Sequence, residues 1–196
     1  VSNRLIFKGD RVEDMVFTGS FQVSEDDATE VPGTLSLVDV DVIEESGTYQ
    51  WEFMPEDQEA FLPVYGTVNV TAMIYDTVKG VDALKEVKNL KELYAVDLSG
   101  EGLKNLSLLE GATNLRVLDA GNNNLTDITG IDGCSRLEYL SLYGNTKLSK
   151  VDVLLNKWYL VGVSLSETNV PDDVQKQIQD ICNLTTKQRN AKAAGE

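Results

Sequence analysis

The stretch "NLRVLDAGNNNLTDITGIDGCSRLEYLSLYGN", residues 114–145, contains the same pattern of apolar residues and asparagine twice, with a 22-residue period. The first copy consists of Leu115, Leu118, Ala120, Asn123 and Leu125. The second consists of Leu137, Leu140, Leu142, Asn145 and, displaced by one position, Leu148. A fixed period of this length is typical of a solenoid, in which each repeat buries its apolar residues against its neighbours.

The pattern continues in both directions. Four copies begin at Leu93, Leu115, Leu137 and Leu160, so the period is almost constant along this part of the chain. Between copies an apolar residue occurs at every third position, as in Leu103, Leu106, Leu109 and Ala112, then Leu125, Ile128, Ile131 and Cys134, then Leu148, Val151 and Leu154. Threefold spacing favours a 3₁₀-like or extended return segment over an α-helix, which has about 3.6 residues per turn.

These residues resemble the leucine-rich-repeat family, in the 22-residue form of internalins and other Gram-positive surface proteins. The family pattern LxxLxLxxNxL is matched in full by "LRVLDAGNNNL" and, except for one inserted residue, by "LEYLSLYGNTKL". The resemblance implies that LxxLxL forms a short parallel strand and that the Asn side chain binds backbone groups of the next turn. Glu101 and Thr168 replace this Asn in the outer copies, so we expect less regular end repeats.

The C-terminal region predicts a cap. "VPDDVQKQIQDICNL" has Pro171 and two acids where a helix begins, and acids are favoured there by the helix dipole. Its apolar residues at helical spacing predict a capping helix over 171–184 that closes the solenoid of residues 93–170. Residues 185–196 offer nothing further to bury, so we expect a disordered tail.

The N-terminal region, residues 1–75, lacks the 22-residue period and has the alternation typical of β-strands. Strand signals occur in "RLIFK", "DMVFTG", "GTLSLVDVDV", "GTYQWEF" and "GTVNVTAMI". Short strands without helix signals predict a small antiparallel sandwich. The order "GTYQWEFMPEDQEAFLPVYGTVNV" is similar to the last strands of bacterial immunoglobulin-like modules, with Pro55, Asp57 and Phe61 at the positions of the connecting loop.

Residues 76–92 connect the two regions. Counting back one period from Leu93, Val96 and Leu98 places Thr71, Ile74 and Asp76 in the repeat frame, which predicts a degenerate first turn that caps the solenoid. The segment "DALKEVKNLKEL" is also rich in helix formers, so a short amphipathic helix is an equal alternative. Either structure would cover the first repeat. The predicted fold is therefore mixed: an all-β immunoglobulin-like sandwich, a short leucine-rich-repeat solenoid with a parallel sheet, and a capping α-helix.

Composition limits the classes of partner. The formal net charge of −15 would repel a phosphate backbone, so we expect no binding of nucleic acid. No apolar run is long enough to span a bilayer, and we expect no membrane insertion. The chain begins without Met, which indicates a processed or excised piece. Separately, we expect the protein to be a monomer. Two cysteines do not form a disulfide framework and are expected to be buried thiols.

The sequence contains little evidence of a catalytic site. The sequence contains no histidine, the commonest general base and metal ligand, so nucleophilic triads that need it are excluded. Acids are adjacent at residues 25–27, 44–45 and 172–173, but glycoside hydrolysis needs two carboxylates across a cleft, which adjacency does not establish. "DAGNNNLTDITGID" does not have the spacing of a calcium loop. We therefore expect no enzymatic activity, no metal and no cofactor.

The side chains between the leucines are the candidates for binding, because they alternate with the core along each strand. Strands in register would form rows across a concave face, and the predicted ligand-binding residues on these rows are Tyr139, Tyr143, Asp97, Asp119, Ser141 and Val117. The two tyrosines would supply a large contact area at a small entropy cost.

The sequence thus favours a bacterial extracellular or cell-surface module that binds a host or bacterial surface protein or a glycan in adhesion. Two alternatives are open. The chain could be a structural spacer that displays another domain, or an accessory region of a carbohydrate-active enzyme.

Overall fold

The computed structural model describes residues 5–15, 17, 19–73 and 75–195. The chain forms two compact units, Val1–Ile74 and Tyr75–Glu196. Charge is distributed unevenly between them, because residues 1–74 hold fifteen acidic and three basic side chains, whereas residues 75–196 hold seventeen and fourteen. The acidity of the protein is therefore concentrated in the first unit, and the second is close to neutral.

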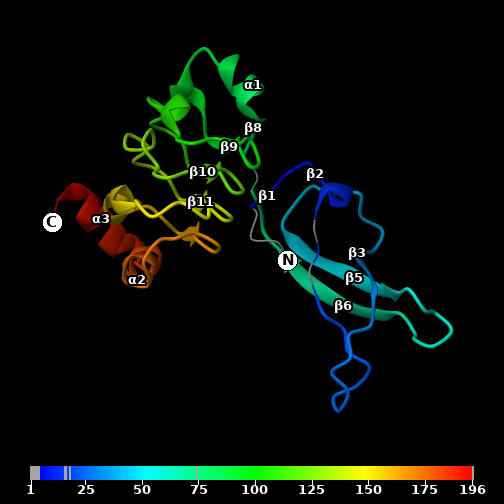
Figure 1. The fold of residues 1–196 in the computed structure, drawn as a ribbon. Helices are drawn as coiled ribbons and strands as arrows, with labels where there is room; N and C mark the ends of the chain where they lie inside the picture. The colour runs from blue at the N-terminus through cyan, green and yellow to red at the C-terminus, as the bar shows by residue number, and fades with distance from the viewer. Residues whose placement is uncertain (1–4, 16, 18, 74, 196) are drawn as a thin grey trace. The chain divides into compact units, whose positions relative to one another are not determined.

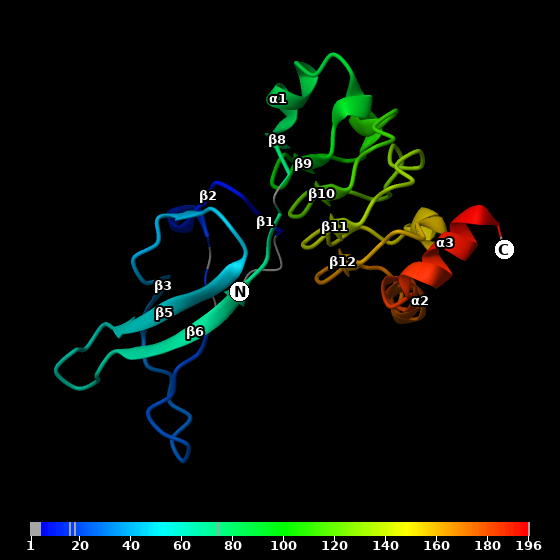
Figure 2. The same ribbon diagram turned by 180° about the vertical axis from the view of Figure 1, so that it is seen from behind.

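The second unit is built on a parallel five-stranded sheet (Figures 1 and 2). Its strands are, in spatial and sequence order, β8 (Thr77–Lys79), β9 (Ala95–Asp97), β10 (Val117–Asp119), β11 (Tyr139–Ser141) and β12 (Gly162–Ser164). Each of the first four strands pairs in parallel with the strand that follows it in sequence. The predicted parallel sheet of repeats is thus confirmed.

The leucines of the pattern form one continuous core. Leu98, Leu115, Leu118, Leu137 and Leu142 have no solvent-accessible surface. Burial of an apolar side chain of this size contributes about 1.5–3 kcal/mol, so a stack of such residues dominates the stability of the unit.

The return segments follow the threefold spacing. Two of them contain 3₁₀ turns, η3 (Ser107–Leu109) and η4 (Asp152–Asn156), and each buries the apolar residue that recurs at every third position, Leu109 and Leu154. The expected 3₁₀ or irregular return segments are therefore confirmed in these two repeats.

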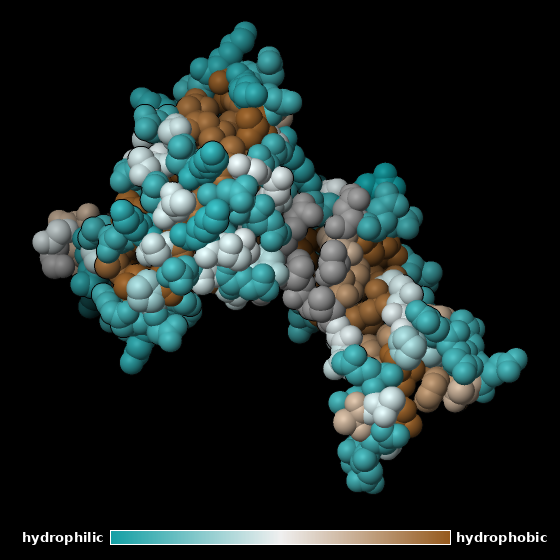
Figure 3. All heavy atoms as spheres, viewed as in Figure 1, coloured by the Kyte–Doolittle hydropathy of each residue, from teal (hydrophilic) through white to brown (hydrophobic). Residues whose placement is uncertain are grey.

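The turn that precedes the first full repeat is shorter than predicted. Val78 of β8 pairs with Val96. The prediction that Ile74, one 22-residue period before Val96, occupies the equivalent position is therefore wrong. Ile74 itself lies outside the described residues. The chain then forms a short helix, α1 (Val81–Lys85), and a 3₁₀ turn, η2 (Leu90–Glu92), because the shortened turn leaves room for little more. Both alternatives are therefore present in part, because β8 forms a degenerate first turn in a shifted frame and α1 makes the first residues of the segment 82–93 helical. Apolar surface is visible at this end of the unit (Figure 3).

The C-terminal end of the solenoid is covered by two helices, α2 (Asp172–Cys182) and α3 (Thr186–Ala194) (Figure 2). The disordered tail predicted for 185–196 is therefore wrong over α3. Thr185 and Gln188 form a capping box at the start of α3, which satisfies backbone groups that begin a helix.

Arg189 anchors α3 to the rest of the second unit. Its side chain is buried and donates to four backbone carbonyls: Leu184 at 2.9 Å, Trp158 at 3.0 Å, Cys182 at 2.6 Å, and Leu160. A buried guanidinium needs such acceptors, and these carbonyls belong to the last repeat and to the end of α2. A hydrophobic pattern alone does not reveal this anchor.

The first unit is made of short strands. A three-stranded antiparallel sheet contains β3 (Gly33–Leu37), β5 (Gly47–Pro55) and β6 (Val64–Val70), in the order β3-β5-β6. Two smaller pairs are β1 (Ile6–Phe7) with β7 (Ala72–Met73), which are parallel, and β2 (Asp10–Arg11) with β4 (Val42–Ile43), which are antiparallel; η1 (Val12–Asp14) follows β2. The segments "RLIFK", "DMVFTG" and "GTVNVTAMI" each fall partly outside the described residues.

An aromatic cluster stabilises one face of the three-stranded sheet. The rings of Phe21 and Phe53 stack at 3.9 Å between centroids, and Trp51 lies 5.8 Å from Phe21. Gly66 pairs with Trp51 across β5 and β6, and a Cβ at Gly66 would lie only 2.3 Å from the Trp51 ring. Only glycine fits opposite this indole. The immunoglobulin-like identity of the unit stays a prediction.

Candidate functional site

The predicted rows of side chains are present in the structure. Ala95, Val117, Tyr139 and Gly162 occupy equivalent positions on neighbouring strands, as do Asp97, Asp119, Ser141 and Ser164. The sheet therefore brings the predicted residues of β9, β10 and β11 together as adjacent rows, which a regular 22-residue period requires.

Four of the six predicted binding residues are nevertheless buried. Val117, Asp119 and Ser141 have no accessible surface, and Asp97 is 6% exposed. Asp97 accepts hydrogen bonds from the backbone N–H and the hydroxyl of Ser99, at 3.0 and 2.7 Å, and Asp119 accepts one from the N–H of Gly121 at 2.9 Å. The expectation that these four lie on an open surface is wrong. The two aspartates are buried because their short side chains bind the turns that follow their own strands.

The two tyrosines remain accessible. Tyr139 is half-buried, and its ring lies over Gly162, where an added Cβ would be 3.3 Å from Cδ1. The Tyr143 hydroxyl donates to Glu167 Oε1 at 3.0 Å. This hydrogen bond to a carboxylate raises the pKa of Tyr143, since it stabilises the neutral phenol. Of the predicted set, Tyr139 and Tyr143 are the residues that a ligand could reach.

A second candidate site was not predicted from the sequence. A groove of about 670 Å³ runs along the loops that lead into β10, β11 and β12 and reaches α3, and we call it the α3 groove. It is lined by Arg116, Ser135, Arg136, Glu138, Asn156, Trp158, Tyr159 and Ala193. Two of the lining residues share a position in the repeat, because Arg136 and Tyr159 directly precede the first leucine of their repeats. This shared position does not by itself predict a groove.

Charge in the α3 groove is partly compensated. Arg116 and Glu138, which occupy equivalent positions on neighbouring repeats, form an ion pair. Arg136 is exposed, and within the described part of the chain it forms no hydrogen bond or ion pair. Lys192 of α3 lies 5.2 Å from the centroid of the Trp158 ring. The groove therefore combines an excess of positive charge with aromatic surface.

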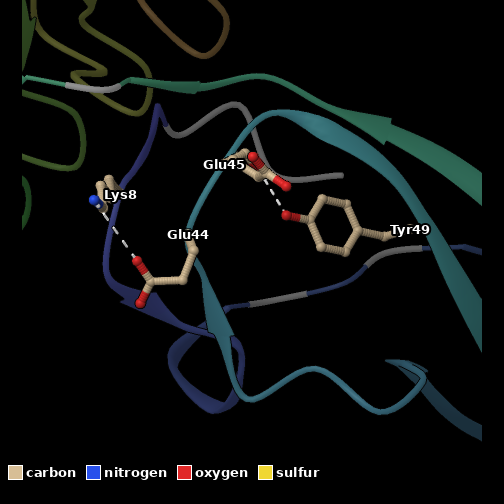
Figure 4. Close-up of polar contacts among 4 residues, drawn as sticks. All are labelled: Lys8, Glu44, Glu45 and Tyr49. Atoms are coloured by element: carbon tan, nitrogen blue, oxygen red, sulfur yellow. Dashed lines mark hydrogen bonds and ion pairs between the residues drawn. The ribbon is translucent and has the colours of Figure 1, made fainter.

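The adjacent acids do not converge on a common point. Figure 4 shows the carboxylate of Glu44 directed toward Lys8, 4.0 Å away, while the backbone carbonyl of Glu45 accepts from the Tyr49 hydroxyl at 2.7 Å. Asp27 binds Thr29 within its own loop, which lowers the pKa of the Asp27 carboxyl. Asp172 and Asp173 lie in the first turn of α2, where the helix dipole favours them.

Two buried groups of the solenoid core have shifted pKa values. Cys134 is 1% exposed, and burial raises the pKa of its thiol. Lys157 is 3% exposed and donates to the carbonyls of Ile131 and Asp132 at 2.8 and 2.5 Å, while burial lowers the pKa of its ammonium group. Through these hydrogen bonds, Lys157 stabilises the loop at residues 131–132.

The described residues contain neither a metal cluster nor a membrane span. Across these ranges, no three His, Cys, Asp or Glu side chains gather closely enough to hold a metal ion. Within the same part of the chain, no helix has the length and apolar character needed to cross a bilayer. The expected absence of a cofactor stays a prediction.

Comparison with known proteins supports the assignment of the repeats. Residues 113–156 match the family model of leucine rich repeats in two copies. This segment contains β10, β11 and the return segment between them, and repeats of this family are commonly protein-binding modules. A search of curated proteins gave no match.

Proposed function

We propose that the chain is a non-enzymatic binding module of a bacterial cell-surface or secreted protein, and that it recognises a protein or a glycan through Tyr139 and Tyr143. The observation that carries this proposal is the position of these tyrosines. They lie on one strand and the turn after it, and both are accessible in a region whose other predicted residues are buried. Tyrosine is enriched among residues that contribute most to binding energy.

The immunoglobulin-like and internalin-like assignments belong to the same proposal. The hairpin β5–β6 and the turn at Asp57 support the first, because Asp57 accepts from the N–H groups of Glu59 and Ala60 at 3.1 and 3.0 Å and so orders the loop between the strands. The 22-residue register of β9, β10 and β11 supports the second. A repeat module that follows an immunoglobulin-like module in the sequence is consistent with adhesion at a cell surface.

The burial of Val117, Asp119 and Ser141 favours a second function, that of a structural spacer. In this case the repeats would extend or stiffen a longer surface protein or carbohydrate-active enzyme. A spacer predicts that no side chain of the rows affects binding of any ligand.

An array of glycans and surface proteins would separate the two functions. The wild-type chain is compared with Tyr139→Ala/Tyr143→Ala, and Asn124→Ala serves as a control because its side chain is exposed and lies in the same repeats. A binding module predicts spots that the double variant loses and the control keeps. Identical signals from all three proteins would contradict recognition through the tyrosines.

A further inference from the structure

We propose that the α3 groove is a separate binding site for an acidic peptide segment, in which Arg136 holds a carboxylate of the peptide and Trp158 and Tyr159 contact a neighbouring aromatic side chain. This site goes beyond the proposed function, because Tyr139 and Tyr143 do not line the groove. The occupant is inferred from the charge, the aromatic surface and the size of the groove.

Among the cations that line the groove, Arg136 is available to a ligand. The Arg116 guanidinium is engaged by Glu138, whereas Arg136 is exposed and, over the described residues, has no ion-pair partner. A guanidinium presents parallel N–H groups that match the two oxygens of a carboxylate. The lining thus contains one ion pair, between Arg116 and Glu138, and one guanidinium group, that of Arg136, that can bind a carboxylate of the ligand.

Lys192 adds positive charge next to Trp158 of the groove. Its ammonium group lies above the Trp158 ring, and it comes from α3, whose Ala193 also lines the groove. The Arg189 guanidinium of the same helix donates a hydrogen bond to the backbone carbonyl of Trp158 at 3.0 Å. The helix therefore both shapes the groove and makes it more positive, and it does so in the unit that is nearly neutral.

The aromatic residues suit a peptide side chain. Tyr159 is 37% exposed and Trp158 is partly exposed, and tryptophan, tyrosine and arginine are the residues most enriched at centres of protein recognition. Ser135 and Asn156 provide hydrogen-bonding groups for a peptide backbone. The volume of about 670 Å³ lies in the range of sites that enclose a small ligand, so it fits a few residues of an extended chain.

The experiment uses NMR, because the chain has two indole groups, in Trp51 and Trp158, and only the second lines the groove. The probe is an acetylated and amidated hexapeptide in which Asp and Tyr alternate. The matched peptide has Asn in place of Asp. We expect the Trp158 indole signal to shift and saturate with the Asp peptide, the Trp51 signal to stay fixed, and the Asn peptide to bind at least about tenfold more weakly.

Variants identify the group that holds the carboxylate. Arg136→Glu should weaken binding by about tenfold or more, and Arg136→Lys should have an intermediate effect, because it retains the charge and loses the fork. Lys147→Glu is the control, since Lys147 is exposed, does not line the groove and changes the net charge by the same amount. Tyr139→Ala/Tyr143→Ala should bind the Asp peptide as the wild type does.

Three results would overturn the proposal. The first is no saturable shift of Trp158 at peptide concentrations up to about 1 mM. The second is equal weakening by Arg136→Glu and Lys147→Glu, which would indicate diffuse attraction. The third is a Trp158 shift with an oligogalacturonate and none with the peptide, which would assign the groove to an acidic glycan. None of these results bears on the tyrosines, so this proposal and the proposed function fail independently.

Discussion

Asn123 and Asn145, which occupy the same position in successive repeats, make equivalent hydrogen bonds. The Asn123 amide donates to the carbonyls of Leu98 and Ala120, at 2.8 and 3.0 Å, and its oxygen accepts from the N–H of Leu103 at 2.9 Å. The Asn145 amide donates to the carbonyls of Ala120 and Leu142, at 2.9 and 2.8 Å, and its oxygen accepts from Leu125 at 3.1 Å. The carbonyl of Ala120 is shared, so the two side chains link three consecutive turns of the solenoid.

Replacing Asn145 should destabilise the repeats strongly. Asn145→Ala leaves the buried N–H of Leu125 without its acceptor, which costs about 1–3 kcal/mol, and removes one of the donors to each of the carbonyls of Ala120 and Leu142. We expect the free energy of unfolding, measured by urea titration followed by circular dichroism, to fall by about 3 kcal/mol. Asn124→Ala, at an exposed position, should change it by less than about 0.5 kcal/mol. A similar loss in both variants would show that the ladder contributes little.

Arg189 should be required for α3. Arg189→Met removes the donor to four carbonyls and should lower the free energy of unfolding by about 3 kcal/mol, with faster hydrogen exchange over Thr186–Ala194. Lys187→Met, an exposed change of similar size in the same helix, is the control. Slow exchange of α3 in Arg189→Met would mean that other contacts hold the helix.

The buried thiols should make stability fall at alkaline pH. Burial raises the pKa of Cys134 and Cys182, so the unfolded chain loses these protons at lower pH than the folded chain. The folded state then binds more protons above the ordinary thiol pKa, and the stabilisation present at lower pH decreases as pH rises through about 9. Cys134→Val should make the decline between about pH 8 and pH 10 shallower in urea titrations. An unchanged slope would assign the decline to other groups.

The regular part of the fold was predictable because it depends on burial, which the sequence shows as a period. Leu115 and Leu137 occupy equivalent core positions, and a parallel register follows once they do. The shorter turn before β9 was not predictable in the same way, since its strand Thr77–Lys79 carries no leucine that continues the period.

The candidate sites were less predictable, because they depend on polar contacts between distant residues. Asp119 reads as a surface residue between two apolar positions, yet it binds the turn at Gly121 and is buried. The α3 side of the α3 groove is formed by a helix that Arg189 anchors in a segment whose composition predicts disorder. One buried arginine among polar residues gives no periodic signal.

Glu167 occupies a strained position beside Tyr143. Its φ of 56° lies in the left-handed region, and the equivalent residues of the preceding repeats are Gly144, Asn122 and Gly100, which also have positive φ values. This region costs a residue with a Cβ about 1–2 kcal/mol, whereas glycine adopts it freely.

Glu167→Gly should therefore stabilise the unit and change Tyr143 at the same time. We expect a gain of about 1 kcal/mol in the free energy of unfolding, because the strain is relieved although the unfolded chain becomes more flexible. The pKa of Tyr143, followed by NMR of labelled tyrosine, should fall because its hydrogen bond to Glu167 is lost. Glu167→Ala is the matched control: it should lower the Tyr143 pKa equally and give no gain in stability, since alanine keeps the Cβ. Equal stability of the two variants would show that the turn relaxes without cost, and an unchanged Tyr143 pKa in both would show that Glu167 does not hold the phenol in solution.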